Sequence, residues 1–214
     1  MSGYRMMMLG PPGAGKGTQA KRLAQELEIP HVSTGDMLRD AKRRDTELGR
    51  EAAEYMNAGK LVPDEVVIGI VAERLEQDDA AQGFILDGFP RTRPQAEALT
   101  DMGVELEAVI NIEVSDEEVV RRLGGRLSCP ECGAVYHKEA NPPSQDDVCD
   151  KCGNRGLVTR DDDRPEAIKQ RLASYHRQTA PLVEFYEQRG VLEAIAGEAG
   201  PDEVTQEILD RLAD

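Results

Sequence analysis

The stretch Gly10-Pro-Pro-Gly-Ala-Gly-Lys-Gly-Thr18 decides the fold, and it follows the short apolar run Tyr4-Arg-Met-Met-Met-Leu9. Gly10, Gly15 and Lys16 have the spacing of a P-loop, with Gly17 at the usual Ser/Thr position and Thr18 one place later. In such a loop the glycines let backbone N–H groups face a phosphate, and the following helix directs its positive end there. A glycine-rich turn that merely caps a helix is the simpler alternative. The strand before and the helix after the loop favour binding of a nucleoside triphosphate.

Outside this loop, two kinds of apolar pattern alternate along the chain. Compact β-rich runs lie at 84–86 and 108–112, each followed by a helical stretch, and helical spacing also recurs over about 34–44, 48–58 and 64–77. A long helix is expected over 165–189, with Pro181 near a kink, and then a strand at 191–195 and a terminal helix. Alternating strands and helices predict the α/β class, with a P-loop three-layer α/β/α core around a parallel sheet.

The run Phe84-Ile-Leu-Asp87 predicts a strand that ends in a carboxylate. At the carboxyl edge of the sheet, Asp87 would lie beside the P-loop and could hold a water molecule bound to Mg²⁺. Asp87 could instead only open a turn before Gly88. No Asn-Lys-x-Asp segment for reading guanine is present, which disfavours a regulatory GTPase.

Four cysteines form two pairs, Cys129-Pro-Glu-Cys132 and Cys149-Asp-Lys-Cys152. The spacing fits a four-cysteine zinc ribbon, with Gly133 and Gly153 supplying the turn after each pair. Four thiolates leave no open position for water, so the predicted zinc site is structural, and iron could occupy the same ligands during expression. Free or redox-active thiols are the alternative.

The composition excludes several classes of protein. The chain has 214 residues and a formal net charge of −15, which argues against a general nucleic-acid binder. No apolar run approaches the length of a membrane span, and the first ten residues do not have the pattern of a secretory signal. Acidic residues recur in clusters and only seven of the basic residues are lysine, which favours adaptation to high salt over an ordinary acidic surface.

Five motifs stand in the order seen in adenylate kinases, and the chain resembles the long form of that family with a zinc-bearing lid. They are Gly10–Gln19, Ser33-Thr-Gly-Asp-Met-Leu-Arg39, Lys60-Leu-Val-Pro-Asp64, Asp87-Gly-Phe-Pro-Arg-Thr92 and Tyr175-His-Arg-Gln-Thr-Ala-Pro-Leu182. The resemblance implies a core domain over 1–32, 63–124 and 164–214. It also implies an AMP-binding insertion at 33–62, called the first insertion below, and a lid with a zinc ribbon at 125–163.

The resemblance also implies roles for individual residues. The expected catalytic set is Lys16, Asp87, Arg91, Arg126, Arg160 and Arg171. The expected ATP site is Gly13, Ala14, Gly15, Lys16, Gly17, Thr18, Arg126, Val135, Tyr136 and Gly200. The expected AMP site is Thr34, Arg39, Lys60, Leu61, Val62, Gly88, Phe89, Pro90, Arg91, Gln95, Arg160 and Arg171. Chemistry supports the arginines, because phosphoryl transfer needs positioned cations and a guanidinium group can contact two phosphate oxygens.

The expected activity is therefore reversible transfer of the terminal phosphoryl group of ATP to AMP, with Mg²⁺, giving two ADP. We also expect a cytoplasmic monomer that uses no nucleic acid and no membrane. Kinases of the same fold that act on UMP or CMP, or that use GTP as donor, remain alternatives. A zinc-ribbon ATPase that binds nucleic acid, and a P-loop protein without catalysis, are further alternatives, disfavoured by the net charge and by the full arginine set respectively.

Overall fold

A computed structural model describes residues 4–213 of the chain. A five-stranded sheet in the order β2-β3-β1-β4-β7 forms its centre, and all four pairings between neighbouring strands are parallel. The strands of this sheet are β1 (Arg5–Leu9), β2 (His31–Ser33), β3 (Phe84–Asp87), β4 (Ala108–Glu113) and β7 (Leu192–Ala196). The predicted α/β class with a parallel sheet is confirmed.

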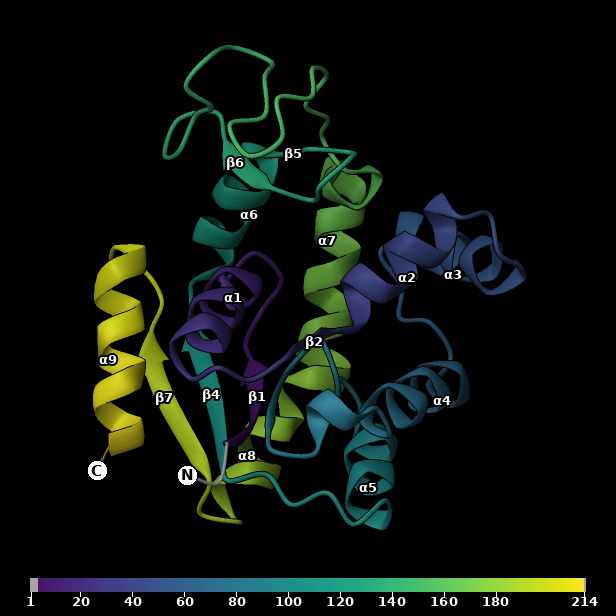
Figure 1. The fold of residues 1–214 in the computed structure, drawn as a ribbon, viewed down its shortest axis with the longest axis vertical. Helices are drawn as coiled ribbons and strands as arrows, with labels where there is room; N and C mark the ends of the chain where they lie inside the picture. Colours follow the sequence, from purple (N-terminus) through teal and green to yellow (C-terminus); the bar gives the residue numbers. More distant parts are fainter. Residues whose placement is uncertain (1–3, 214) are drawn as a thin grey trace.

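Helices cover both faces of the sheet, as Figure 1 shows. The helices of the core are α1 (Lys16–Glu26), α4 (Asp64–Leu75), α5 (Arg93–Asp101), α6 (Asp116–Gly124), α7 (Pro165–Ser174), α8 (Pro181–Glu187) and α9 (Pro201–Ala213). Alternate residues of β1 divide between the two faces, so that Met6 and Met8 pack with α1 and α9, whereas Met7 and Leu9 pack with α4, α5 and α8. A strand that is buried on both faces reads as a continuous apolar run, which is why 4–9 lacks alternation.

The first insertion consists of two short helices, α2 (Thr34–Arg43) and α3 (Glu47–Asn57). Side-chain caps fix where they start, because Ser33 accepts a hydrogen bond from the N–H of Asp36 and Thr46 accepts one from Gly49. Gly49 also allows close packing, since a Cβ there would lie 2.2 Å from the backbone of Ala41. In Figure 1 the pair extends away from the sheet beside α7.

The lid contains a two-stranded antiparallel sheet of β5 (Arg126–Ser128) and β6 (Val135–His137), followed by long loops. It lies above the sheet at the end of α6 in Figure 1 and returns to the core through the 3₁₀ turn η2 (Asp161–Asp163). A second 3₁₀ turn, η1 (Asp78–Ala80), follows α4. The division of the chain at 33–62 and 125–163 stays an interpretation.

Two details differ from the elements expected from the sequence. His31–Ser33 forms an edge strand that no pattern indicated, because three residues are too few to show a period. The helix expected over 165–189 is divided by a π-helical turn, η3 (Tyr175–Thr179), ahead of Pro181. Within this turn the N–H of Ala180 donates to the carbonyl of Tyr175, five residues back, and the Thr179 hydroxyl donates to the carbonyl of Arg91 at 2.8 Å. The turn thus connects α7 and α8 to the loop that carries Arg91.

Candidate functional site

The P-loop joins β1 to α1 at the carboxyl edge of the sheet. Gly10, Gly13 and Gly15 all have positive φ, and a Cβ at Gly10 would lie 2.4 Å from the carbonyl oxygen of Ile112. The Lys16 ammonium group folds over the loop and donates to the carbonyls of Gly10 and Pro11, each at 2.7 Å. Burial lowers the pKa of Lys16 to about 7, with Asp87 opposing and the neighbouring arginines adding to the shift. A polyanion in this loop would restore the charge of Lys16.

Asp87 ends β3 next to the P-loop, as predicted. Its Oδ2 lies 3.3 Å from His31 Nε2, and a Cβ at Gly17 would lie 3.1 Å from the same oxygen. Burial raises the pKa of Asp87, but the hydrogen bond with His31 and the charge of Lys16 outweigh it and leave that pKa below its ordinary value. The side chain is therefore an ionised carboxylate at the phosphate end of the site. Hard oxygen donors of this kind suit Mg²⁺, so the residues present fit that ion.

The expected acceptor residues gather between β3, the first insertion and α5. The Thr34 hydroxyl donates to the carbonyl of Gly88 at 2.9 Å, and Val62 is buried against the core. Gln95 is also buried, and its amide has a fixed orientation: Nε2 donates to Asp64 at 2.7 Å and Oε1 accepts from the N–H of Arg91 at 2.7 Å. Asp64, which closes the motif Lys60–Asp64 but had no role assigned from the sequence, thereby sets the direction in which the Gln95 amide faces.

The predicted arginines converge from different elements. Arg91 follows β3, Arg126 opens β5, Arg160 precedes η2 and Arg171 lies on α7, while Arg39 comes from α2. Burial, together with the charges of Arg126 and Arg39, lowers the pKa of Arg160 to about 10. Burial likewise lowers the pKa of Arg91 and of Arg171. So many mutually repelling cations indicate a site built for a polyanion.

One continuous cleft of about 1110 Å³ connects these parts. Of all the predicted nucleotide-site residues, Phe89 is the one that does not line it, because its side chain is fully buried in the apolar core. The P-loop, Asp87, Lys60, Leu61, Val62, Pro90, Gln95, Val135, Tyr136, Gly200 and the five arginines all line the cleft. The structure thus brings P-loop, first insertion and lid around one space.

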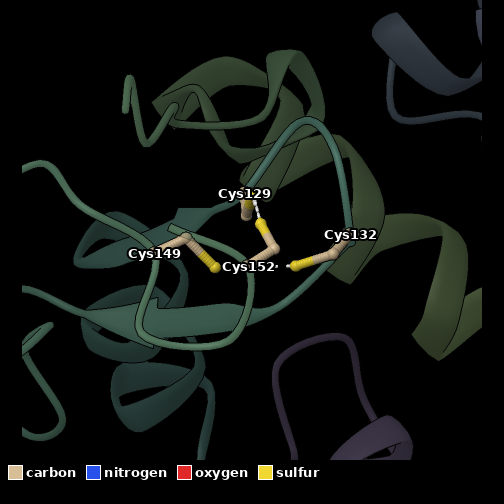
Figure 2. A group of neighbouring side chains, drawn as sticks. All are labelled: Cys129, Cys132, Cys149 and Cys152. Carbon is tan, nitrogen blue, oxygen red and sulfur yellow. Dashed lines mark hydrogen bonds between the residues drawn. The ribbon is translucent and has the colours of Figure 1, made fainter. Parts of the chain in front are cut away.

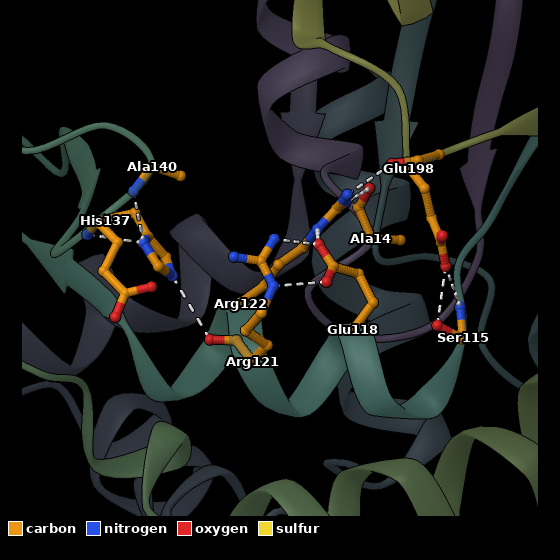
Figure 3. Close-up of polar contacts among 10 residues, drawn as sticks. Ala14, Ser115, Glu118, Arg121, Arg122, His137, Ala140 and Glu198 are labelled. Atoms are coloured by element: carbon orange, nitrogen blue, oxygen red, sulfur yellow. Dashed lines mark hydrogen bonds and ion pairs between the residues drawn. The ribbon is translucent and has the colours of Figure 1, made fainter.

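Sequence reasoning missed a group of residues on α6, which Figure 3 shows. Arg122 donates to the carbonyls of Ala14 in the P-loop, at 3.3 Å, and of Gly197 after β7, at 2.8 Å. Glu118 accepts from Arg121 and Arg122 and is held ionised, with its pKa lowered to about 2 chiefly by the hydrogen bond from Arg121. In the sequence, the paired arginines just before Gly124 and Gly125 could have indicated this group. All three side chains line the cleft.

Four thiols meet in the lid, as Figure 2 shows. The Sγ atoms of Cys129, Cys132, Cys149 and Cys152 all lie within 4.8 Å of one another, and the pairs 129–152 and 132–149 are 3.6 and 3.5 Å apart. Tetrahedral Zn²⁺ with bonds of about 2.3 Å needs sulfur atoms about 3.8 Å apart, so the cluster fits the ion. Gly133 and Gly153 have positive φ and donate to the carbonyls of Cys129 and Cys149, which confirms the two expected turns.

The lid and the first insertion touch each other directly. Arg43, at the end of α2, donates to the carbonyl of Glu131 at 2.9 Å, and Lys42 lies 3.3 Å from the carboxylate of Asp161. These contacts close the cleft between two parts that are both attached to the core.

Comparisons with known proteins agree with this geometry. Residues 8–191 match a family described as Adenylate kinase. The chain is 54% identical to an adenylate kinase of Archaeoglobus fulgidus over 95% of each chain. It is 50% identical to one of Caldicellulosiruptor saccharolyticus over 97% of this chain and 98% of the relative. It is 51% identical to one of Methanosarcina barkeri over 95% of each chain.

No helix within residues 4–213 has both the length and the apolar character needed to cross a membrane. Match, identity and coverage lead to one conclusion: this chain is an enzyme of the adenylate kinase family.

Proposed function

We propose that this enzyme transfers the terminal phosphoryl group of ATP directly to AMP, reversibly, giving two ADP. One observation carries the proposal: the P-loop with Lys16, the acceptor residues at Thr34 and Gln95, and the arginines from core, first insertion and lid all line one cleft. A donor in the P-loop and an acceptor beside Thr34 would point their phosphates toward Arg91, Arg126 and Arg171. Direct transfer needs two such adjoining sites and no protein nucleophile.

Electrostatic stabilisation is the main contribution of these side chains. Negative charge spreads over the transferring group in the transition state, and fixed cations stabilise it without reorganisation. Arg91 is held by donation from Nε to the carbonyl of Gly88 at 2.7 Å, and Arg160 by donation from Nε to the Ser128 hydroxyl at 2.8 Å. Both guanidinium groups are therefore anchored by one edge while the other edge can meet phosphate. Mg²⁺, when bound with ATP near Asp87, would neutralise phosphate oxygens.

The lid excludes water from the cleft. A terminal phosphate that is poised for transfer would otherwise be lost to hydrolysis, so closure protects the reaction and brings Arg126 and Arg160 to it. We assign structural Zn²⁺ to the four cysteines, because the lid buries only Ser128, Cys129, Tyr136, Cys149 and Asp163 and has almost no apolar core of its own. A metal replaces those missing contacts.

Adenine is the proposed acceptor base because of Thr34 and of the fixed amide of Gln95. A coupled assay separates this proposal from a kinase for UMP or CMP, and the same assay with GTP in place of ATP separates it from a kinase that uses GTP as donor. ATP is mixed with AMP, UMP, CMP or GMP in saline buffer with magnesium, and ADP formation is followed. We expect AMP to give the highest kcat/KM. A clear preference for a pyrimidine nucleotide would refute the proposed acceptor, and no ADP from ATP and AMP would refute the proposed reaction.

We further propose that the protein works as a cytoplasmic monomer in a saline medium. Reduced thiols suit a zinc site in a reducing compartment, and the formal charge of −15 supports adaptation to high salt. Sedimentation in buffers from dilute to molar salt would check the monomeric state and the adaptation to salt, because a stable dimer would contradict the first and loss of the native fold at high salt the second.

A further inference from the structure

The Tyr136 hydroxyl lies against the cysteine cluster of the lid. Its oxygen is 3.4 Å from Cys149 Sγ, and the backbone N–H of Asp150 donates to it at 2.8 Å. A hydroxyl has one proton and two lone pairs, and the N–H of Asp150 occupies a lone pair. A thiolate that holds Zn²⁺ carries no proton, so with the metal bound the hydroxyl is the donor toward Cys149. Tyr136 is therefore placed as an outer-sphere partner of the metal site.

The same side chain belongs to the wall of the nucleotide cleft. Tyr136 is the middle residue of β6 and lines the cleft, whereas Cys149 is 0% exposed and does not line it. Each cysteine pair also reaches the cleft through one residue, Cys132 in the first pair and Lys151 in the second. The cysteine cluster thus forms part of the cleft wall, and Tyr136 contacts both the cluster and the cleft.

Loss of the metal requires Tyr136 to move. Tyr136, Cys129 and Cys149 pack into one small buried cluster, so a competing chelator reaches Cys149 only after the lid opens around it. A nucleotide against the ring of Tyr136 holds the ring in place and opposes that opening. Two ligands that stabilise the same conformation bind cooperatively, and the coupling is equal in both directions. Zn²⁺ and the nucleotide should therefore each strengthen the binding of the other.

We propose that Tyr136 couples the metal site of the lid to the donor site. Its hydroxyl positions Cys149 for Zn²⁺, and its ring makes release of the metal sensitive to bound ATP. The part that concerns ATP rests on the proposed function. Outer-sphere partners of metal ligands contribute about 10- to 100-fold to metal affinity, and couplings between two binding sites are about 5- to 150-fold.

The first test compares Tyr136→Phe with Tyr4→Phe in the zinc-loaded full chain. Tyr4 is a matched control, because its hydroxyl also donates one hydrogen bond, to the carbonyl of Leu212 at 3.0 Å, but it does not line the cleft. A chromogenic chelator that competes for Zn²⁺ gives the affinity of the metal and its rate of release. We expect Tyr136→Phe to lower the affinity by about 10- to 100-fold and Tyr4→Phe to match the unmodified protein. An affinity of Tyr136→Phe within about twofold of the unmodified protein would refute the role of the hydroxyl.

The second test repeats the competition with ATP and excess Mg²⁺. Free ATP itself binds Zn²⁺ and speeds its removal, so a slower release reports on the protein. We expect ATP to slow release at least about fivefold in the unmodified protein and in Tyr4→Phe, and less than about twofold in Tyr136→Phe. Equal slowing in Tyr136→Phe and the unmodified protein, or no slowing in either, would overturn the coupling.

ATP binding by calorimetry and ADP formation are measured first on the unmodified protein. If ATP binds and ADP forms but ATP does not slow release of the metal, the proposed function holds and the coupling is wrong. If ATP does not bind, the proposed function and the coupling fail together, and the zinc affinity of Tyr136→Phe decides the role of the hydroxyl.

Cobalt provides a signature that a merely structural role of Tyr136 would not produce. Co²⁺ exchanged into the lid absorbs light by charge transfer from thiolate to metal, and a hydrogen bond to the sulfur raises the energy of that band. Tyr136→Phe should therefore shift the band to longer wavelength while the circular dichroism spectrum stays unchanged. An unshifted band in the folded variant would show that the hydroxyl does not donate to Cys149, and the proposal would fall.

Discussion

The low pKa of Lys16 predicts that ATP binding takes up a proton. In the nucleotide-free protein that pKa is about 7, because burial disfavours the ammonium group. A group with this pKa is protonated in about one tenth of the molecules at pH 8 and in about nine tenths at pH 6. Lys16 in the free protein is thus mainly neutral in mildly alkaline buffer.

A triphosphate bound in the P-loop favours the protonated, charged form of Lys16. Two unit charges 4 Å apart attract by about 4 kcal/mol at an effective dielectric constant of 20, which corresponds to about three pKa units. The pKa of Lys16 then rises well above 8, so Lys16 takes up about 0.9 proton when ATP binds at pH 8 and about 0.1 when ATP binds at pH 6. The phosphate groups of ATP, with a last pKa near about 6, are already ionised at pH 8 and do not contribute there.

Calorimetric titrations with ATP in buffers of different ionisation enthalpy measure this uptake directly. The dependence of the heat on the buffer should show proton uptake at pH 8. At pH 6 Lys16 contributes almost nothing, and the buffer dependence that remains there comes from the terminal phosphate of ATP, which is about half protonated and loses protons on binding. Lys16→Met removes the titrating group and should abolish the dependence at pH 8. If the unmodified protein takes up no proton at pH 8, or if the methionine variant takes up as many, the argument from burial is wrong.

Three further outcomes follow from the site. Lys16→Met should lower kcat by more than about 100-fold while leaving the circular dichroism spectrum intact, and near-native turnover would contradict the role of the P-loop. Cys129→Ser should release the metal and split thermal unfolding into a lid step and a later core step, because bound structural zinc contributes on the order of 10 kcal/mol to the folding free energy of such a unit. A single unchanged unfolding transition in metal-free protein would count against this prediction. The midpoint of thermal unfolding should rise from dilute to molar NaCl, since screening relieves repulsion on a surface with a net charge of −15, and full stability in dilute buffer would remove the case for salt adaptation.

The sequence was most informative where chemistry restricts the residue type. The P-loop glycines, the paired cysteines and the cleft arginines occupy positions that few other residues could fill. In the structure the cysteines form one cluster, and the P-loop and the arginines line one cleft. The parallel sheet was predictable because each compact buried strand of the sheet is followed by an amphipathic helix.

Other features depend on tertiary neighbours, and the sequence alone does not establish their roles. Asp163 was one of three consecutive aspartates, and only the fold shows that it is buried between two arginines while Asp161 is exposed. Phe89 stands inside a nucleotide-site motif, yet its side chain belongs to the core. Arg122 had no role assigned from the sequence, and only the fold places the P-loop and Gly197 beside it.

The contact between Arg43 of the first insertion and Glu131 of the lid couples two parts that are expected to hold different nucleotides. When either the first insertion or the lid is closed, the other can form this contact. Binding of a nucleotide in one site therefore favours closure over the other site. The adjoining Lys42–Asp161 pair is solvent-exposed, and dissolved ions compete with it. Product escape should therefore quicken as the ionic strength of the medium rises, without any change in the reacting groups.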